Sequence, residues 1–427
     1  MGSRHDPGRR QVRPASRSPF SRPGRSKPPC ASEVPQPQTS LQQDAVKQPD
    51  LDRRYMALAV RLAAKGRGHT SPNPMVGAVV VSGRRIVGQG YHRRPGGPHA
   101  EVLALRSAGG RAHGATLYVT LEPCHHTSKR TPPCVPAIIE SGLRRVVVAI
   151  RDPNPLVSGR GISRLRRAGI QVTIGCLREE AERLNEIYCH WMRTGRPFVI
   201  MKAAMTLDGK IAAASGESRW ITGEAGRRHA HRLRSQVDAV MVGIGTVLRD
   251  DPQLTVRLGD RRSRAPRLRQ PLRVVVDSTL RISPAAHVLS PGASTGPGSG
   301  SVVATTARAP RARIERLRAK GVPVVVLPAQ HGRVSLRACL THLGRMGITS
   351  LLIEGGSELN ASVLRAGLVN RVLFYLAPTL LGGRDAKGVI GGQAPQRLAG
   401  ALPLTDLRTQ RIGRDLLIEG ALQPRGN

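Results

Sequence analysis

The sequence predicts two successive α/β domains behind a polar N-terminal extension. First, 427 residues are more than one ordinary core usually holds. Second, helical and strand-like blocks alternate from Asp52 onward. Third, Gly195-Arg196-Pro197 ends a charged helical pattern directly before a new strand pattern. We therefore expect an extension at residues 1–50 and domains at residues 51–195 and 196–427.

The extension holds many Arg, Pro, Ser and Gln residues and little that could be buried, so we expect it to be disordered. Two other interpretations stay open. The segment could precede a misassigned start, or it could be a transit peptide, since it is rich in Arg and Ser and poor in acids. We expect no secretory signal, because no apolar stretch follows the arginines, prolines and serines at the N-terminus, and no apolar run approaches the length of a membrane span. The six cysteines form no disulfide framework. We expect a cytoplasmic protein.

The first domain begins with a helical pattern of apolar residues from Tyr55 to Ala63, stopped by Gly66. Further helices are expected to start near His99 and near Pro133, and to span residues 161–168 and 177–194. Buried strands are predicted at residues 76–81, 86–91, 115–121 and 146–150.

The second domain repeats the alternation of strands and helices. Its strands are predicted at residues 198–205, 239–243, 272–277, 302–305, 322–327, 350–353 and 371–376. Residues 259–270 are rich in Arg, and residues 291–300 are rich in Gly and Ser. Both stretches are expected to be exposed loops.

The formal net charge of +39 does not by itself predict a nucleic-acid partner. The charge is spread from end to end, consists almost entirely of Arg, and is not interleaved with aromatic residues that could stack on bases. Most of it is expected to be surface background, with binding of phosphorylated small molecules as its specific use. We expect no specific nucleic acid and no membrane as partner.

One imidazole and two thiolates predict a catalytic zinc site at His99, Cys124 and Cys134. Three protein ligands leave the fourth position of zinc for water, whereas structural sites close all four. Glu101 lies two residues after its ligand on the first helical turn, where it can accept the water proton and pass it to a departing amine. His125 and His126 are rival ligands, although a soft site prefers the two thiolates.

These residues resemble the bifunctional riboflavin-biosynthesis deaminase-reductase family over roughly residues 51–420. In the first domain the resemblance rests on four runs of sequence. They are Thr70-Ser71-Pro72-Asn73-Pro74-Met75-Val76-Gly77, Tyr91-His92 before Pro98-His99-Ala100-Glu101, Thr131-Pro132-Pro133-Cys134, and Asp152-Pro153-Asn154-Pro155. The resemblance implies a cytidine-deaminase-like three-layer domain followed by a dihydrofolate-reductase-like α/β domain.

For the first domain, the resemblance implies a pocket for the pyrimidine and its ribose phosphate. Its residues would be Asn73, His92, Arg130, Asp152 and Asn154. Nine residues separate Cys124 from Cys134, one more than is usual in the family, so Lys129 is the alternative to Arg130. Asn73 could instead be a turn residue between two prolines.

In the second domain, the resemblance rests on runs such as Leu207-Asp208-Gly209-Lys210, Gly216–Thr222, Gly245–Pro252 and Ile353-Glu354-Gly355-Gly356. No Gly-x-Gly-x-x-Gly motif opens a helix here, which argues against a Rossmann domain but not against a reductase. Glycines that follow a strand and begin a helix let backbone amides approach a phosphate, although a plain tight turn is the alternative.

The resemblance also implies the contacts of the second domain with its ligands. NADPH would contact Ala204, Trp220, Thr246, Asp250, Ser278 and Gly356. The substrate would contact Ser218, Arg234, Leu254, Arg257 and Glu354. Arginines suit a ribose phosphate because the guanidinium is a fork of donors, although a single arginine is usually solvated and Trp220 could be a core residue.

The resemblance implies zinc-dependent deamination of 2,5-diamino-6-(ribosylamino)pyrimidinone 5'-phosphate, followed by NADPH-dependent reduction of the ribosyl group to ribityl. The cofactors would be one Zn²⁺ and NADPH, and we expect a homo-oligomer, either a dimer or a tetramer. Two alternatives are a zinc deaminase of another pyrimidine or of nucleic acid with an inactive second domain, and a basic nucleic-acid-binding protein with structural zinc.

Overall fold

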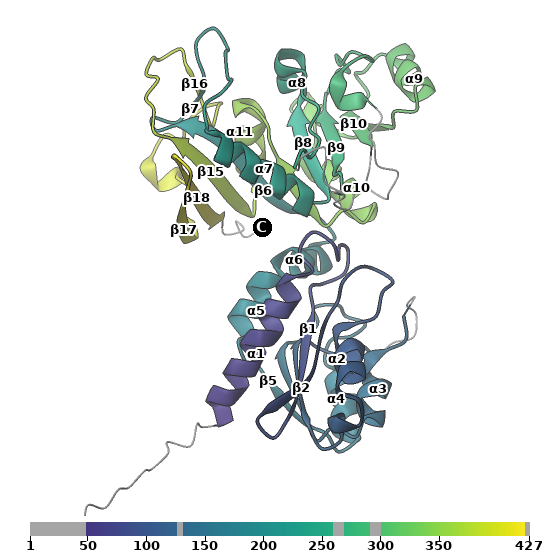
Figure 1. The fold of residues 1–427 in the computed structure, drawn as a ribbon. Helices are drawn as coiled ribbons and strands as arrows, with labels where there is room; N and C mark the ends of the chain where they lie inside the picture. The colour runs from purple at the N-terminus through teal and green to yellow at the C-terminus, as the bar shows by residue number, and fades with distance from the viewer. Residues whose placement is uncertain (1–47, 126–130, 259–268, 291–299, 423–427) are drawn as a thin grey trace, which may run out of the picture. The chain divides into compact units, whose positions relative to one another are not determined.

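The computed structural model describes residues 48–125, 131–258, 269–290 and 300–422 (Figure 1). Lys129, Arg130, His126, most of the extension and most of both predicted loops lie outside these residues. Helix α1 (Gln48–Ala64) already includes the last three residues of the predicted extension. Its buried face is made by Tyr55, Met56, Ala59, Leu62 and Ala63, which follow the apolar period seen in the sequence.

A five-stranded mixed sheet forms the core of the first α/β unit. Its strand order is β2-β1-β3-β4-β5, with β1 antiparallel to both neighbours and β3, β4 and β5 parallel to one another. The strands are β1 (Gly77–Ser82), β2 (Arg85–Tyr91), β3 (Thr116–Leu121), β4 (Arg145–Ile150) and β5 (Gln171–Ile174). The first four were predicted to within one residue at each end, whereas β5 was missed.

Helices cover both faces of this sheet and make three layers (Figure 1). On one face α1 packs with α5 (Arg178–Leu184) against β1, β3 and β4. On the other face lie α2 (Ala100–Ala108), α3 (Cys134–Glu140) and α4 (Arg160–Arg167), with the short 3-10 turn η1 (Gly109–Ala112). The predicted layered α/β arrangement is confirmed.

The single helix predicted at residues 177–194 is wrong, because α5 ends before Asn185 and α6 (Glu186–Thr194) begins after it. The buried Asn185 side chain accepts from the backbone nitrogen of Met75 at 2.8 Å and donates to its carbonyl at 2.9 Å. An Asn that pairs with distant backbone in this way interrupts a helical pattern without any Pro or Gly.

A nine-stranded sheet, in the order β11-β10-β9-β8-β14-β6-β15-β18-β17, forms the second unit. All pairs from β11 to β15 are parallel, and the pairs β15–β18 and β18–β17 are antiparallel. The parallel strands are β6 (Phe198–Thr206), β8 (Ala239–Gly243), β9 (Leu272–Val276), β10 (Ser301–Thr305), β11 (Val324–Val326), β14 (Ser350–Ile353) and β15 (Arg371–Ala377). These are the seven strands that the sequence predicted.

The C-terminal hairpin of β17 (Leu404–Ile412) and β18 (Asp415–Leu422) was not predicted from the sequence. Four short strands and two 3-10 turns were not predicted either. They are β7 (Lys210–Ala212), β12 (Ala329–Gln330), β13 (Arg333–Val334), β16 (Lys387–Gly388), η2 (His287–Leu289) and η3 (Leu398–Gly400).

Two apolar cores, one on each face, hold the larger sheet. One includes Ile244 of α8 (Ile244–Asp250) and Leu317 of α9 (Arg311–Ala319), and α7 (Glu224–Gln236) packs there through Leu233. The other includes Leu343 of α10 (Leu336–Arg345) and Val363 of α11 (Ser357–Arg365). No helix in the described ranges is both long and apolar enough to cross a membrane.

Candidate active sites

Three elements bring the predicted metal ligands together. His99 caps the N-terminus of α2, Cys124 follows β3, and Cys134 is the first residue of α3. The carbonyl of Cys124 accepts from the backbone nitrogens of Cys134 and Val135 at 3.0 and 3.1 Å, which ties the two cysteine segments to each other. Both thiols are buried in the core of the first domain.

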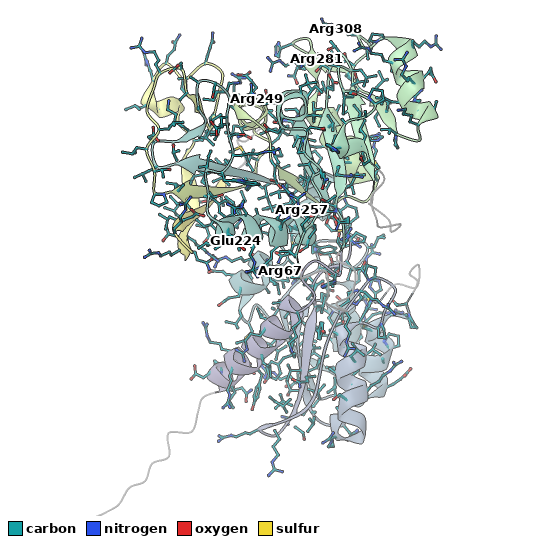
Figure 2. All side chains as sticks on the ribbon, turned by 45° about the horizontal axis from the view of Figure 1, so that its top comes forward. Arg67, Glu224, Arg249, Arg257, Arg281 and Arg308 are labelled. Atoms are coloured by element: carbon teal, nitrogen blue, oxygen red, sulfur yellow. The ribbon has the colours of Figure 1, made fainter. Side chains whose placement is uncertain are left out.

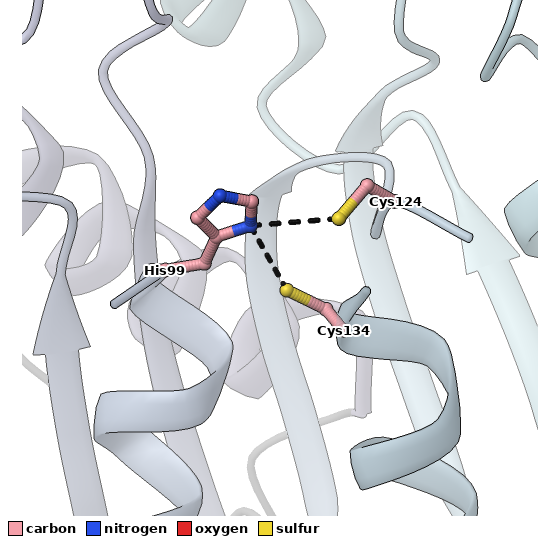
Figure 3. A group of neighbouring side chains, drawn as sticks. All are labelled: His99, Cys124 and Cys134. Carbon is pink, nitrogen blue, oxygen red and sulfur yellow. Dashed lines mark hydrogen bonds between the residues drawn. The ribbon is translucent and has the colours of Figure 1, made fainter. Parts of the chain in front are cut away.

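The ligand atoms of these residues face a common point (Figure 3). Nδ1 of His99 lies 3.1 Å from Sγ of Cys134 and 3.5 Å from Sγ of Cys124. All three atoms lie within 4.8 Å of one another, and among the described residues the group does not include His125. Zinc bonds of about 2.0 Å to nitrogen and 2.3 Å to sulfur are compatible with such separations.

The chemistry of the two thiols fits a bound cation. The hydrogen bond with Cys124 and burial together raise the pKa of the Cys134 thiol well above its usual value. A divalent metal reverses this effect because its charge favours deprotonated thiol ligands. These three residues would therefore hold zinc.

Glu101 lies beside the ligands on the first turn of α2 and is 3% exposed. Burial raises the pKa of its carboxyl group, and the neighbouring His99 opposes this shift. A carboxyl group with a raised pKa can alternate between accepting and donating a proton near neutral pH, which is what a general acid-base catalyst must do.

A cavity of about 820 Å³ adjoins the metal ligands, and its lining includes Asn73, His92, Asp152 and Asn154. The amide nitrogen of Asn73 lies 3.0 Å from Nε2 of His92, so this ring nitrogen accepts. Nδ1 of His92 therefore carries the hydrogen and donates to the carbonyl of Pro98 at 3.2 Å. His92 is thus oriented toward the turn that bears His99.

The Asp152-Pro153-Asn154 turn is fixed from both sides. Oδ1 of Asp152 accepts from Tyr188 Oη at 3.0 Å and from the backbone nitrogen of Asn154 at 2.9 Å. Oδ1 of Asn154 accepts from the backbone nitrogen of Leu156 at 3.0 Å. These bonds hold both side chains at the cavity wall.

The second domain has a cavity of about 270 Å³ where strands β6, β8 and β14 end. Six of the predicted ligand contacts line it. They are Ala204, Ser218, Thr246, Asp250, Glu354 and Gly356. Ser278 lines an adjoining cavity, which also contains Gly243 and Gly245. Parallel strands commonly place ligands at their carboxyl ends.

Glu354 is the electrostatic centre of this cavity. Its carboxylate accepts from Nε and Nη2 of Arg234 at 2.6 and 3.0 Å, and Nζ of Lys202 lies 3.5 Å away. Burial alone would raise the pKa of Glu354, but the charges of Arg234 and Lys202 lower it to about 2. Glu354 therefore stays ionised and fixes both cations.

Four predicted contacts are not among the residues that line these cavities. Trp220 is 68% exposed and lies under the Arg227 guanidinium, 4.6 Å from its ring centroid. Leu254 is buried in the apolar core, and Arg234 points its guanidinium at Glu354. Arg257 is exposed, and its Nη1 donates to Gln253 at 3.2 Å.

Three further residues at these sites were not assigned a role from the sequence. Thr131 Oγ1 lies 3.0 Å from Nε2 of His99 and orients the imidazole ring. Buried Glu122 accepts from the backbone nitrogens of Gly159 and Ile162 at 2.9 and 3.2 Å, and so anchors α4 next to Cys124. Lys202 has no signal in the sequence either, because its pairing with Glu354 joins two strands that are distant in the chain.

Comparison with known proteins agrees with both sites. Residues 49–150 match the cytidine and deoxycytidylate deaminase zinc-binding region, and residues 197–418 match the RibD C-terminal domain. Riboflavin biosynthesis protein RibD of Actinobacillus pleuropneumoniae is 47% identical over 370 residues, which are 87% of this chain and 94% of that protein. The chain belongs to the RibD family. The RibD protein of Escherichia coli is 43% identical over 86% of this chain and 98% of its own length.

Solved RibD structures share the fold. Acinetobacter baumannii RibD superposes with a TM-score of 0.78 at 37% identity, and covers 88% of this chain and 100% of its own. A deaminase/reductase from Thermotoga maritima gives a TM-score of 0.74 at 34% identity with the same coverage. As a RibD family member, the chain is a bifunctional deaminase and reductase of riboflavin biosynthesis that uses zinc and NADPH.

Proposed function

We propose that the chain deaminates 2,5-diamino-6-(ribosylamino)pyrimidinone 5'-phosphate and then reduces the ribosyl group, giving 5-amino-6-(ribitylamino)uracil 5'-phosphate. The main observation behind this proposal is that one chain holds both a deaminase-type metal site and a reductase-type cavity. A His-Cys-Cys cluster adjoins buried Glu101, and a glycine-lined cavity contains Lys202 and Glu354. The Thermotoga maritima relative is named for a deaminase and a reductase of such phosphoribosylaminopyrimidines.

The deamination step assigns the proton transfers to Glu101. When bound to His99, Cys124 and Cys134, zinc supplies an activated water. Glu101 accepts the proton of that water and returns it to the departing amino group, so that ammonia leaves and a carbonyl remains. Asn73, His92, Asp152 and Asn154 hold the pyrimidine and ribose, and Arg130 binds the phosphate.

In the reduction step, NADPH supplies a hydride to the sugar carbon that bears the nitrogen. The ring oxygen released from that carbon must gain a proton, and the ammonium group of Lys202 is a donor that lines the cavity next to Glu354. Ser218, Leu254 and Glu354 position the sugar, while Arg234 and Arg257 provide positive charge for its phosphate. Ala204, Trp220, Thr246, Asp250, Ser278 and Gly356 hold the cofactor.

We further propose domains at residues 51–195 and 196–427, a cytoplasmic location and a homo-oligomer. The five cysteines of the described residues are free thiols, which suits a reducing compartment. Strand β17 supports the oligomer, because it is the last strand of its sheet and eight of its nine residues are exposed. Exposed sheet edges are usually covered or paired in proteins.

A two-arm assay tests this function. Purified protein is given the diaminopyrimidine phosphate with and without NADPH, and ammonia, NADPH oxidation and the pyrimidine products are measured. We expect ammonia in both arms and the ribityl product only with NADPH. Ammonia without any reduction would contradict the reductase assignment, and the absence of ammonia would contradict the deaminase assignment.

A further inference from the structure

Lys202 lies on β6 between two strands that contact it in different ways. On the β14 side, the carboxylate of Glu354 lies 3.5 Å from its Nζ. On the β15 side, Leu373 pairs with Lys202, and Tyr375 lies two residues further along the same face. Nζ of Lys202 lies 5.7 Å from the centroid of the Tyr375 ring. We infer that Tyr375, held in turn by His229, is a positioning residue that directs the Lys202 ammonium group toward the sugar.

The inference rests on the proposed role of Lys202 as proton donor in the reduction, and it begins with the carboxylate. Arg234 donates to both oxygens of Glu354, from Nε at 2.6 Å and from Nη2 at 3.0 Å. The 3.5 Å separation between Lys202 and Glu354 is longer than an ordinary charge-assisted hydrogen bond of about 2.7–2.9 Å. The carboxylate therefore holds the ammonium group from one side only, and a second contact is needed to fix its direction.

The ring of Tyr375 supplies this second contact. A lysine ammonium group within about 6 Å of a ring centroid is attracted by the negative face of the ring, and the attraction is larger when both groups are shielded from water. Tyr375 is 1% exposed, and the side chain of Lys202 is 16% exposed. Tyr375 is not among the residues that line the cavity, so it acts through Lys202 and not on a ligand.

His229 anchors the far end of this ring. It lies on α7 one turn before Leu233, which packs on the same face of the sheet. Nδ1 of His229 lies 2.6 Å from Tyr375 Oη. Burial raises the pKa of the Tyr375 hydroxyl, whereas burial and the charge of Arg232 lower the pKa of His229. The phenol therefore keeps its hydrogen and donates it to the neutral imidazole.

Three variants of the full-length protein separate positioning from packing. Tyr375→Phe keeps the ring and loses the hydroxyl, whereas Tyr375→Leu removes the ring. The matched control is Phe374→Leu, because Phe374 is the preceding residue of β15 and packs against the core on the other face of the sheet.

Steady-state reduction of the deaminated substrate by NADPH is measured for each variant. We expect Tyr375→Leu to lower kcat by roughly 3-fold to 30-fold while the KM values for substrate and NADPH change by less than about 2-fold. Tyr375→Phe should restore most of the lost kcat, because the ring face remains. Phe374→Leu should leave kcat unchanged. Equal losses of kcat in Tyr375→Leu and Phe374→Leu would overturn the inference, because the loss would then reflect packing.

A double-mutant cycle tests the anchoring role of His229. His229→Ala and Tyr375→Phe each remove the bond between the imidazole and the phenol. The double variant H229A/Y375F should therefore be no slower in reduction than the slower of the two single variants. Additive losses of kcat would overturn the role of His229, because the two residues would then act separately.

A spectroscopic measurement tests the contact without catalysis and separates it from the proposed function. The chain has eight lysines, so protein labelled with 13C-lysine gives few signals, and Lys202→Arg identifies the signal of Lys202. The ring current of an aromatic face shifts such a signal upfield. We expect this shift in the wild type and in Tyr375→Phe, and its loss in Tyr375→Leu.

An unshifted wild-type signal, or a shift that survives in Tyr375→Leu, would overturn the inference. If the wild type reduced no substrate, the proposed function would fail, whereas the shifted lysine signal would still support the contact. If reduction proceeds but kcat is the same in Tyr375→Leu and the wild type, the positioning role fails alone.

Discussion

Glu101 is expected to move protons without holding the metal. The carboxyl group is buried beside the ligands but is not a member of the three-residue cluster. Glu101→Gln should therefore keep one equivalent of zinc while its deamination rate falls by roughly 100-fold or more. Zinc content by atomic absorption and ammonia release measure the two effects, and the reductase rate is an internal control. Loss of zinc in this variant would show that Glu101 is a ligand.

The two arginines proposed for the substrate phosphate should behave differently. Arg234 and Glu354 form a buried pair, with side chains 14% and 9% exposed. Arg234→Ala leaves the carboxylate with Lys202 alone, and we expect the free energy of unfolding to fall by about 3 to 5 kcal/mol.

Arg257 serves as the comparison for Arg234, because it is an arginine proposed for the same phosphate but is exposed. Arg257→Ala should change the free energy of unfolding by no more than about 0.5 kcal/mol. It should instead raise the KM for the ribosyl substrate by roughly 10-fold or more and leave NADPH affinity unchanged. If this variant abolished NADPH binding and left the substrate KM unaltered, the assignment of roles in the second domain would be reversed.

Single residues were predictable where sequence spacing carries the chemistry. The zinc ligands could be recognised because few other kinds of site use one histidine and two cysteines in this pattern. The structure brings His99, Cys124 and Cys134 together. Thr131 and Glu122 could not be singled out in this way, because their bonds to His99 and to the start of α4 exist only after folding. Contacts of Trp220 with the cofactor and of Leu254 with the substrate were inferred only from the resemblance. Because neither residue lines the cavities of the second domain, both contacts stay predictions.

At the scale of elements, Asn185 is expected to hold the first domain together. Its two bonds to the backbone of Met75 join the break between α5 and α6 to the segment that leads into β1. Asn185→Ala leaves two partly buried backbone groups of Met75 without these partners and should lower the free energy of unfolding by about 1 to 3 kcal/mol.

Denaturant unfolding measures this effect, and Arg178→Ala is its control. Arg178 lies in the same helix pair and forms an exposed ion pair with Glu182, so this change should cost less than about 0.5 kcal/mol. Equal stability of the Asn185→Ala variant and the wild type would mean that water replaces both bonds.

Strand patterns predicted most of both sheets because buried parallel strands are continuous runs of Val, Ile, Leu and Ala. The hairpin of β17 and β18 escaped prediction since β17 is almost wholly exposed and shows no apolar run. A turn signal was present at Gly413, which adopts a φ of 63° between the two strands. The helix break at Asn185 carries no such local signal.

At the scale of the whole molecule, the arginines of the described residues come from many elements rather than from one. The arginines labelled in Figure 2 come from several different elements, including α8 and the loops after β9 and β10. Removal of residues 1–47 should leave both activities unchanged. The reason is that α1, the helix that contributes to the core of the first domain, begins at Gln48. Equal rates for the shortened and full chains would support this expectation, and failure of the shortened chain to fold would refute it.

The reductase domain is expected to be active without the deaminase domain. The deaminase domain, in contrast, has a loop that is held by a hydrogen bond to the reductase domain. Ser71, two residues from Asn73, donates to Oδ2 of buried Asp238 at 2.9 Å. A chain beginning at residue 196 should bind NADPH and reduce the already deaminated substrate. Ser71→Ala in the full chain should slow deamination several-fold and leave reduction unchanged. An unaltered deamination rate would mean that this bond does not position the Asn73 loop.

Removing the metal tests the two-site account most directly. Zinc-free protein, prepared by chelation, is given NADPH together with either the diaminopyrimidine phosphate or its deaminated product, and NADPH oxidation is followed. We predict no oxidation with the diaminopyrimidine, the wild-type rate with the deaminated product, and recovery of the first reaction when zinc is restored. Wild-type oxidation with the diaminopyrimidine in the absence of zinc would contradict the account, because reduction would then not depend on prior deamination at His99, Cys124 and Cys134.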